Sequence, residues 1–392
     1  MNTVELHRLD GSGCLPAGCL SCPLLSTCGG IERPGGAWSC MDNCARCDPG
    51  CDRVCLHRPR AFVEALHEID TFGTRRLGPI TGPAAPVGLP RYVPVLQHPK
   101  SHTEPLSLAW AAIPLHALLR GRKSARLRYS TGADLRDAWR LLPDTRVIIV
   151  GTGRDPHIER YWRWRRLNDL PTQLASLDVS AIVAPNYSVF WEDPRPQHLF
   201  NRKRSLLCAA EFAGAGLPTV PFLTGITRGD WLFWARFLSE RPHLVAVAKE
   251  FQTGRAHPAR GQNALERLRR LEVGLGRNLH LVAIGATRFR HELARNFRSW
   301  TLLDSTPFMK AIKRQQALGF TPRRVHWQPA HGAPVSALLQ QNIDIYTRWL
   351  DVCFLQASSP STSAPTVSKR PRRAPPPPRD EPSRQLHLPI RA

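Results

Sequence analysis

Between residues 92 and 305 the chain alternates short apolar runs with amphipathic segments, and this alternation limits the folds it can adopt. Runs that are apolar along their whole length indicate strands buried on both faces, as in parallel sheets covered by helices. The segments between them, such as ADLRDAWRLL and NALERLRRLEVGLG, have the apolar spacing of helices that pack on such a sheet. The predicted strands are residues 92–98, 125–131, 146–151, 181–186, 219–224, 244–251, 279–286 and 300–305.

Eight strands separated by helices predict an α/β fold of the (β/α)8 TIM-barrel type over residues 92–356. An open, doubly wound parallel sheet is the alternative arrangement of the same elements. No G-x-G-x-x-G motif follows any predicted strand, so a dinucleotide site is not indicated. Residues 61–91 are predicted to form a helix and a linker rich in Pro and Gly ahead of the barrel.

Nine of the eleven cysteines fall within residues 14–55, a segment rich in Gly and Pro and poor in large apolar residues. Such a segment cannot bury a core of its own, and in a reducing compartment metal ions are its expected cross-links. Residues 1–60 are therefore predicted to form a Cys-rich metal-binding module. Its candidate metal ligands are Cys14, Cys19, Cys22, Cys28, Cys40, Cys44, Cys47, Cys51 and Cys55.

The spacing of the cysteines does not decide which metal they bind. Two tetrahedral zinc sites would use eight thiolates, with the two C-x2-C pairs as knuckles, and one iron–sulfur cluster plus one zinc fits the count equally well. The stretch SCMDNCARCD (39–48) also has the C-x3-C-x2-C spacing of radical-forming iron–sulfur enzymes. Arg46 stands where those enzymes have an aromatic residue and no strand precedes the stretch, so we expect a structural metal module, with radical chemistry as a minority alternative.

The chain carries 54 Lys and Arg against 31 Asp and Glu, a formal charge of +23 at pH 7. Residues 357–392 contribute +5 of this charge, so about +18 belongs to the rest of the chain. An excess of that size favours polyanionic partners, of which nucleic acid, DNA or RNA, is the commonest. The alternative is that the arginines are spread evenly over the surface and keep the protein soluble without binding a particular partner.

Residues 357–392 are rich in Pro, Ser and Arg and poor in large apolar groups, so they are predicted to form a disordered tail. No uninterrupted apolar stretch reaches the roughly 18 residues that a membrane-spanning helix needs. The N-terminal sequence MNTVELHRLDGSG lacks the apolar core of a signal peptide. We therefore expect a cytoplasmic protein without membrane association.

In a parallel barrel the reactive side chains gather at the carboxyl ends of the strands, and polar residues follow several of the predicted strands. A charge that ends an apolar strand is costly unless it is paired or used. The predicted catalytic residues are Asp304, Asp155, Glu250 and Lys249. Gly151 and Gly153 would let backbone amides approach a phosphate, and the predicted substrate-binding residues are Gly151, Gly153, Asn186, Tyr187, Gly285, Ser305 and Lys310.

Two of these residues have an equally simple structural interpretation. Asp155 precedes a proline and can cap a helix, and Tyr187 can be a packing aromatic.

Residues 279–311, LHLVAIGATRFRHELARNFRSWTLLDSTPFMKA, resemble the last two β/α units of tRNA-guanine transglycosylase-type barrels. In that family a strand ends in a Gly-x-Gly-like turn, a short helix follows, and the next strand ends in the nucleophilic Asp. The resemblance places Asp304 at the nucleophile and Ser305 beside it. The family's Asp-Ser-Gly-Gly-Phe-Gln segment has no counterpart in this chain, and its zinc motif follows the barrel, whereas the cysteine cluster here precedes it.

The resemblance implies that Asp304 attacks the sugar C1′ and expels a base, with Asp155 or Glu250 as general acid or base. We thus expect a nucleic-acid-associated barrel that modifies nucleobases, a base-exchanging glycosyltransferase. The alternative is a non-catalytic, metal-containing DNA-binding protein for replication, transfer or regulation. A base-sized pocket with carboxylates at the strand ends favours the enzyme, and strand ends filled by apolar side chains favour the binding protein.

Overall fold

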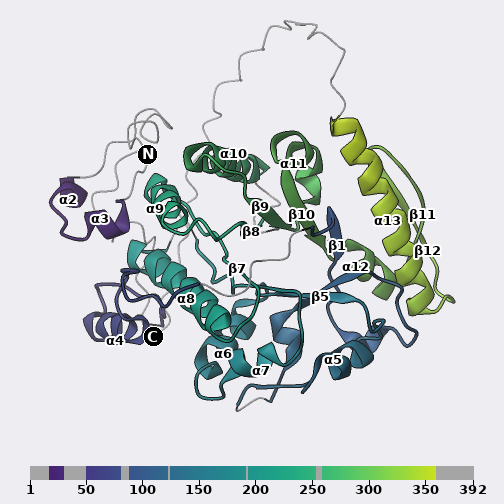
Figure 1. Ribbon diagram of the computed structural model, residues 1–392, viewed down its shortest axis with the longest axis horizontal. Coiled ribbons are helices and arrows are strands. Elements are labelled where there is room, and N and C mark those ends of the chain that lie inside the picture. Colours follow the sequence, from purple (N-terminus) through teal and green to yellow (C-terminus); the bar gives the residue numbers. More distant parts are fainter. Residues whose placement is uncertain are drawn as a thin grey trace, which may run out of the picture. The chain divides into compact units, whose positions relative to one another are not determined.

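The computed structural model describes residues 17–30, 50–80, 88–121, 124–190, 193–252 and 258–358. These ranges belong to one compact unit that ends at Ser358 (Figure 1). The tail predicted for residues 357–392 lies almost wholly outside the described residues, as do Cys14, Cys40, Cys44 and Cys47. No helix within the described ranges has both the length and the apolar character needed to cross a membrane.

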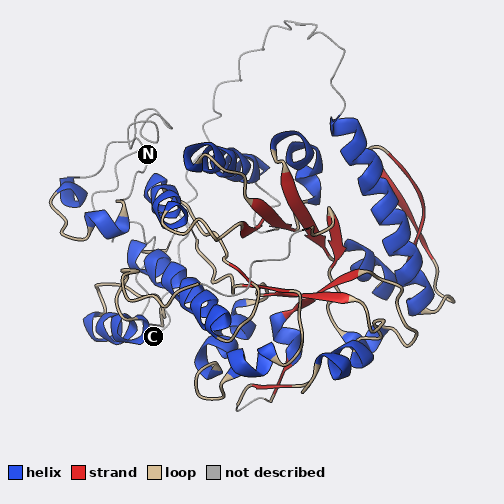
Figure 2. Cartoon of the chain, in the orientation of Figure 1, coloured by secondary structure: helices blue, strands red, loops and turns tan. Residues whose placement is uncertain are grey.

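Eight parallel strands form two four-stranded sheets (Figures 1 and 2). All neighbours in both sheets run parallel, which confirms an α/β fold built on parallel sheets. The first sheet has the order β1 (Tyr92–Pro94), β10 (Ser299–Asp304), β9 (His280–Ile284) and β8 (Ala246–Glu250), and the second has the order β2 (Trp110–Pro114), β5 (Arg146–Val150), β6 (Ala181–Val183) and β7 (Thr219–Val220).

The two sheets are also joined to each other. Beyond β1, Val95 forms a parallel bridge with Ala112 of β2, and the Leu96 amide donates to the Ala112 carbonyl at 2.9 Å. Beyond β7, Phe222 forms a parallel bridge with Ala248 of β8, and the Ala248 amide donates to the Pro221 carbonyl at 2.9 Å. Each edge strand of one sheet therefore contacts an edge strand of the other.

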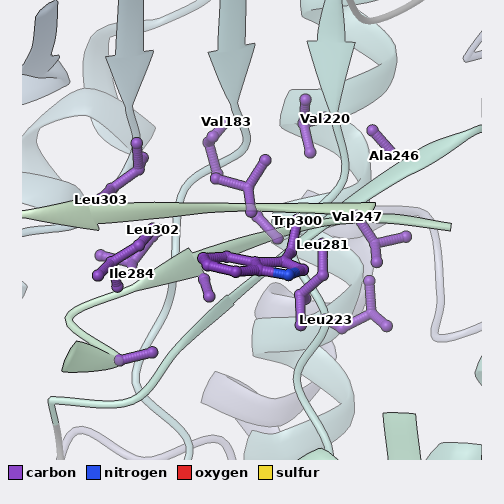
Figure 3. Close-up of a cluster of buried hydrophobic side chains, with 14 of the residues drawn as sticks. Val183, Val220, Leu223, Ala246, Val247, Leu281, Ile284, Trp300, Leu302 and Leu303 are labelled. Atoms are coloured by element: carbon purple, nitrogen blue, oxygen red, sulfur yellow. The ribbon is translucent and has the colours of Figure 1, made fainter. Parts of the chain in front are cut away.

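The strands are apolar on both faces because both faces are covered. One buried cluster takes residues from both faces of the first sheet, such as Leu302 and Leu303, and from one face of the second, such as Val183 (Figure 3). The opposite face of the second sheet, with Ile149 and Ile182, belongs to another cluster that includes residues of the helices beside it. Burial of both faces explains why these runs lack the apolar–polar alternation of half-exposed strands.

Helices separate most of the consecutive parallel strands (Figure 2). Thr131 and Thr227 each begin a helix with a capping box, in which the threonine and an aspartate three residues later exchange hydrogen bonds with backbone amides. The helices of this part are α5 (Gly132–Ala138), α6 (Asp155–Trp164), α7 (Leu170–Ala175), α8 (Arg195–Gly214), α9 (Arg228–Ser239), α10 (Pro258–Leu275), α11 (Arg290–Asn296) and α12 (Thr306–Ile312), with short 3-10 turns at Pro99–Ser101, Leu115–Leu118 and Thr287–Phe289.

The strand predicted at residues 125–131 is wrong. Its only strand residues, β4 (Arg126–Leu127), pair antiparallel with β3 (Leu119–Arg120) in a small hairpin. The parallel strand at this point of the chain is β2, whose sequence WAAIP has two alanines and a proline. Because alanine and proline are depleted in strands, the pattern at this position did not indicate one.

Three further features flank the sheets. Before β1 lie α2 (Ala17–Leu20), α3 (Leu25–Cys28) and α4 (Pro59–Ile69), the last of these where the sequence predicts a helix. After α12 the chain forms an antiparallel hairpin of β11 (Gln315–Thr321) and β12 (Arg324–Pro329). The long helix α13 (Val335–Ser358) follows, and its Phe354 packs edge-on against Trp300 of β10.

Candidate functional site

A cavity of about 1600 Å³ opens at the carboxyl ends of the parallel strands. We call it the strand-end cavity. Each of the eight strands contributes lining residues at or just beyond its carboxyl end, in chain order Gln97, His116, Thr152, Asn186, Thr224, Glu250, Gly285 and Ser305 among others. Reactive groups in parallel α/β folds collect at this edge, because the strand ends and the following loops meet there.

Glu250 is the last residue of β8 and lies in register with Ile284 of β9, which in turn neighbours Leu303 of β10. Side chains in register on parallel strands point to the same face, so Glu250 lies on the same face of the sheet as Ile284 and Leu303. One of its carboxylate oxygens, Oε1, accepts the backbone N–H of Gln252. Glu250 is partly exposed and lines the strand-end cavity.

Asp304 ends β10 and is only 6% exposed, yet it lines the same cavity. Thr287 Oγ1 donates to Oδ2, and the Thr306 amide donates to Oδ1 at 2.6 Å. Tyr346 of α13 donates to Thr287 Oγ1 at 3.1 Å, so Thr287 links it to the carboxylate. The side chain of Asp304 is thus fixed through both oxygens.

Burial, and next the charge of Asp304, raise the pKa of Tyr346 well above its ordinary value. The pKa of Tyr92 is also raised well above that value, by burial first, then by Tyr346 and Asp304. Both phenols therefore stay neutral beside the carboxylate. Asp304 follows Leu303 along β10, and successive side chains of a strand point to opposite faces of the sheet. Because Glu250 lies in register with Ile284 and Leu303, Asp304 reaches the cavity from the face opposite to that of Glu250.

Lys249 also lines the cavity, next to the ring of Trp231, whose centroid lies 5.7 Å from Nζ. Its ammonium donates to the Leu223 carbonyl at 3.3 Å. Burial lowers the pKa of Lys249 to about 8, against the opposing effects of Glu250 and Asp230. A lysine with a pKa of about 8 is mostly charged at pH 7 and half deprotonated at about pH 8.

His116 is a lining residue that the sequence analysis missed. Its ring lies 4.7 Å from that of His157, and burial, followed by the proximity of His157, lowers its pKa to about 4. The imidazole is therefore neutral near pH 7. A side chain on Gly153 would come within 2.9 Å of His116 Nδ1, which explains the glycine at this position. The only available signal was the position of His116 just beyond a strand, and that strand was itself missed.

The structure brings seven of the predicted site residues to the strand-end cavity: Asp304, Glu250, Lys249, Gly153, Asn186, Gly285 and Ser305. It does not place the other four on the lining. Gly151 keeps two strand ends close, because an added Cβ would meet the Val183 carbonyl oxygen at 2.6 Å. Lys310 donates to Gln315 Oε1 at 2.7 Å, at the start of the β11–β12 hairpin.

Tyr187 has the packing role that its sequence context left open, whereas Asp155 does not cap α6, whose N-cap residue is Arg154. Asp155 is the exposed first residue of α6 and accepts a 2.5 Å hydrogen bond from Ser188 Oγ. Tyr187 is buried, with its ring 4.0 Å from the guanidinium carbon of Arg204 and its hydroxyl 3.5 Å from Cys208 Sγ. Neither side chain is part of the cavity lining.

Among the residues that the structure describes, five arginines line the strand-end cavity, and all but Arg288 lie away from the ends of the predicted strands. Of the lining residues within the described part of the chain, two are carboxylates, Asp304 and Glu250, against Lys249 and these arginines. The lining therefore carries a positive excess. We call them the cavity arginines: Arg260 and Arg267 of α10, Arg288 after β9, and Arg323 and Arg324 at the turn into β12.

The described cysteines of the N-terminal segment are Cys19, Cys22, Cys28, Cys51 and Cys55. Among the residues that the structure describes, no group of three or more His, Cys, Asp or Glu side chains is placed to hold a metal ion. Two of the sulfurs accept hydrogen bonds: Cys28 Sγ from Arg195 Nε at 3.4 Å, and Cys51 Sγ from the Arg53 amide at 3.5 Å.

A buried ion network links the Cys28 segment to the strand-end cavity. Arg195 of α8 donates to Asp230 of α9 through two nitrogens, at 3.0 and 2.7 Å, and to the Cys28 carbonyl at 2.5 Å. Arg202 donates to the same carboxylate at 2.9 Å. Asp230 in turn accepts the amide of Ile226, a cavity-lining residue, at 3.0 Å.

No model of a known protein family, no curated protein sequence and no solved structure matches this chain.

Proposed function

We propose that the chain is a (β/α)8-barrel enzyme that exchanges or modifies nucleobases in nucleic acid. The barrel proposal is supported by the two bridges between the sheets, Val95–Ala112 and Phe222–Ala248, which join the edge strands pairwise in chain order. It is also supported by the cavity, to which all eight strands contribute at their carboxyl ends. An open doubly wound sheet would have two free edges instead.

The observation that carries the functional proposal is that the strand-end cavity is open and contains carboxylates. A purely structural barrel needs no charge at the strand ends, and apolar side chains would fill that edge at lower cost. In this chain Asp304 and Glu250 both line a cavity of about 1600 Å³, and Lys249 and the cavity arginines surround them with positive charge. Reactive carboxylates within a cationic cavity suit an anionic substrate.

In the reaction we propose, Asp304 is the nucleophile. Its carboxylate is buried and held through both oxygens, which is the fixed orientation that a nucleophile requires. A carboxylate oxygen gives an electron pair to the sugar C1′, and the C1′–N bond breaks with its pair leaving on the departing base. The sugar is then held as an ester of Asp304.

Glu250 is the general acid and base of the same reaction. Its partial exposure lets it exchange protons with solvent, unlike the buried Asp304. As the acid it protonates the departing base, and as the carboxylate it removes a proton from the incoming base. The incoming nitrogen then displaces Asp304 from C1′ and restores the free carboxylate, so that one base replaces another without oxidation or reduction.

The same proposal includes a metal in the N-terminal segment, either zinc or an iron–sulfur cluster. Support comes from the nine cysteines clustered within residues 14–55. The metal would hold the segment folded, and its binding would accompany local folding. The metal content and absorption spectrum of the purified chain distinguish zinc from iron with sulfide.

Base exchange is the test of the proposed function. Radiolabelled guanine and radiolabelled adenine are each incubated with the chain and with tRNA or genomic DNA as acceptor. We expect label in acid-insoluble nucleic acid for at least one combination, and a loss of more than about 100-fold in Asp304→Asn because the bond to C1′ cannot form. Glu250→Gln should slow exchange by about 10²–10⁴-fold, the usual contribution of a general acid–base.

The matched control is Glu240→Gln, which removes a surface carboxylate that pairs with Arg241. It should leave exchange at the wild-type rate. Incorporation of label by Asp304→Asn at the wild-type rate would remove Asp304 from the chemistry. Binding of nucleic acid by the wild type with no incorporation of either base would overturn the proposal in favour of the non-catalytic DNA-binding alternative.

A further inference from the structure

Three elements bring the cavity arginines together around residues 287–290. An added Cβ on Gly261 of α10 would lie 2.2 Å from the Phe289 ring, so α10 packs tightly against the segment after β9. On the other side, Arg290 donates to the carbonyls of Pro322 and Arg323 at 3.4 Å each, which holds the β11–β12 turn beside the same segment. Arg288 belongs to the same short segment and lines the cavity.

Three of the five arginines differ from ordinary surface arginines in their ion pairing. On the same helix, Arg269 and Arg270 pair with Glu266 at 3.1 and 2.8 Å, as is common on an exposed helical face. Within the described part of the chain, Arg260, Arg323 and Arg324 have no carboxylate partner. All three are exposed and line the cavity, so their charges are available to an anion.

The size of the cavity indicates how large that anion is. Pockets for small ligands and cofactors are typically about 300–1,000 Å³. The strand-end cavity, at about 1600 Å³, exceeds that range, and its arginines extend from α10 across to the β11–β12 turn. A single nucleotide would occupy only part of this space and would leave some of the arginines without a phosphate.

We propose that the cavity arginines bind the phosphates on both sides of the target nucleotide, and that the substrate is an unpaired stretch of polynucleotide. This inference rests on the proposed function, because it assigns the target base to the carboxylates. Guanidinium groups hold phosphate oxygens through paired hydrogen bonds, whatever the sequence. The chain must be unpaired because a base inside a duplex cannot reach the strand ends of a barrel.

Phosphate binding predicts a measurable dependence on salt. For single strands, log K falls with log salt concentration with a slope of about −0.7 per phosphate contact. Loss of two contacts in Arg323→Gln/Arg324→Gln should therefore make the slope shallower by about 1.4. At low salt the same double variant should weaken binding by about 10-fold or more.

Fluorescence anisotropy of a labelled 12-nucleotide strand, prepared as DNA and as RNA, measures this with the full-length chain. The control is Arg269→Gln/Arg270→Gln, which removes the same charge from α10 outside the cavity lining. It should bind within about twofold of the wild type and keep the wild-type salt slope. An unlabelled mononucleotide should compete at least about 100-fold more weakly than the unlabelled strand.

Several outcomes would overturn the inference. Equal weakening by both double variants would mean that net charge alone governs binding. Competition by the mononucleotide as strong as that by the strand, or equal affinity for a duplex of the same sequence, would exclude an unpaired polymer as the preferred ligand. Failure here is separable from failure of the proposed function, because the anisotropy experiment measures the phosphate contacts as binding affinity and requires no base exchange.

Discussion

At the scale of single residues, the strand-end cavity depends on glycines as much as on charges. Gly285 directly follows β9 with φ of +66°, a backbone conformation that side chains with a Cβ rarely adopt. A Cβ at this position would lie 2.0 Å from Cγ of Gln252. The backbone N–H of Gln252 donates to the Glu250 carboxylate. Gly285 therefore allows the chain after β8 to lie against the end of β9 and to hold Glu250 in place.

Replacement of Gly285 by alanine should both strain the backbone and displace Gln252. The left-handed conformation costs a residue with a Cβ about 1–2 kcal/mol. We expect Gly285→Ala to lower the free energy of unfolding by more than that amount, because the side chain of Gln252 must also move. Denaturant unfolding of the variant and the wild type measures the difference.

Gly276 provides the matched control, since its φ is +63° and an added Cβ would have no heavy atom within 4 Å. Gly276→Ala should show the backbone cost alone. If the two alanine variants were equally stable, Gln252 would not be packed against Gly285, and the support that Gly285 gives to Glu250 would be disproved.

The residues that could be found from the sequence are those whose charge interrupts an apolar run. Lys249, Glu250 and Asp304 all end such runs, and all three line the cavity. Arg323 and Arg324 could not be found in this way, because they lie in a hairpin whose position depends on packing rather than on a local pattern. With 54 Lys and Arg in the chain, composition could not select them either.

At the scale of secondary-structure elements, α8 is unusual because the first half of the helix is buried although it is strongly polar. Arg195, Arg202 and Lys203 are each no more than 3% exposed. Arg195 and Arg202 share the Asp230 carboxylate, and Lys203 donates to the Gly73 carbonyl. The spacing of apolar residues cannot reveal such a helix, because charged side chains occupy its buried surface. The surface on which α8 contacts the N-terminal segments was therefore not predictable from the sequence pattern.

Asp230 is the acceptor on which this element depends. Arg195 and Arg202 lower its pKa well below the ordinary value, even though burial acts in the opposite direction. We expect Asp230→Asn to lower the free energy of unfolding by about 3–5 kcal/mol, since it leaves two buried guanidinium groups without a counter-charge. Thermal or denaturant unfolding of the full chain at pH 7 measures the loss.

The control is Asp134→Asn, because Asp134 has the same place in the capping box of α5 and is exposed to solvent. Loss of a cap alone costs about 1 kcal/mol. Asp230 is ionised in the native state at pH values where it is protonated when unfolded. Its contribution is therefore complete above about pH 4 and declines as the pH falls further. Equal losses in the two variants at pH 7 would contradict this account of α8.

At the scale of the whole molecule, the parallel arrangement of the strands was more accessible from the sequence than the junctions between the two sheets. Continuous apolar runs separated by helices sufficed for parallel sheets, since few other arrangements bury both faces of so many strands. The sequence WAAIP did not predict a strand, because alanine and proline are depleted in strands. In the structure, tertiary contacts hold this strand, β2, between β1 and β5. The junctions between the sheets leave no periodic signal, because each consists of a single bridge.

Hydrogen exchange can decide whether those junctions close the barrel. The Leu96 amide at one junction and the Ala248 amide at the other each donate across at 2.9 Å. In a closed barrel every strand has two neighbours, so both amides should open only with the core and exchange as slowly as the centre of β9. The Arg128 amide, which donates at 2.9 Å beside the two-stranded β3–β4 hairpin, should exchange much faster. Exchange at Leu96 and Ala248 as fast as at Arg128 would mean that the sheets separate readily, and the cavity that unites their carboxyl ends would then not be a stable site for catalysis.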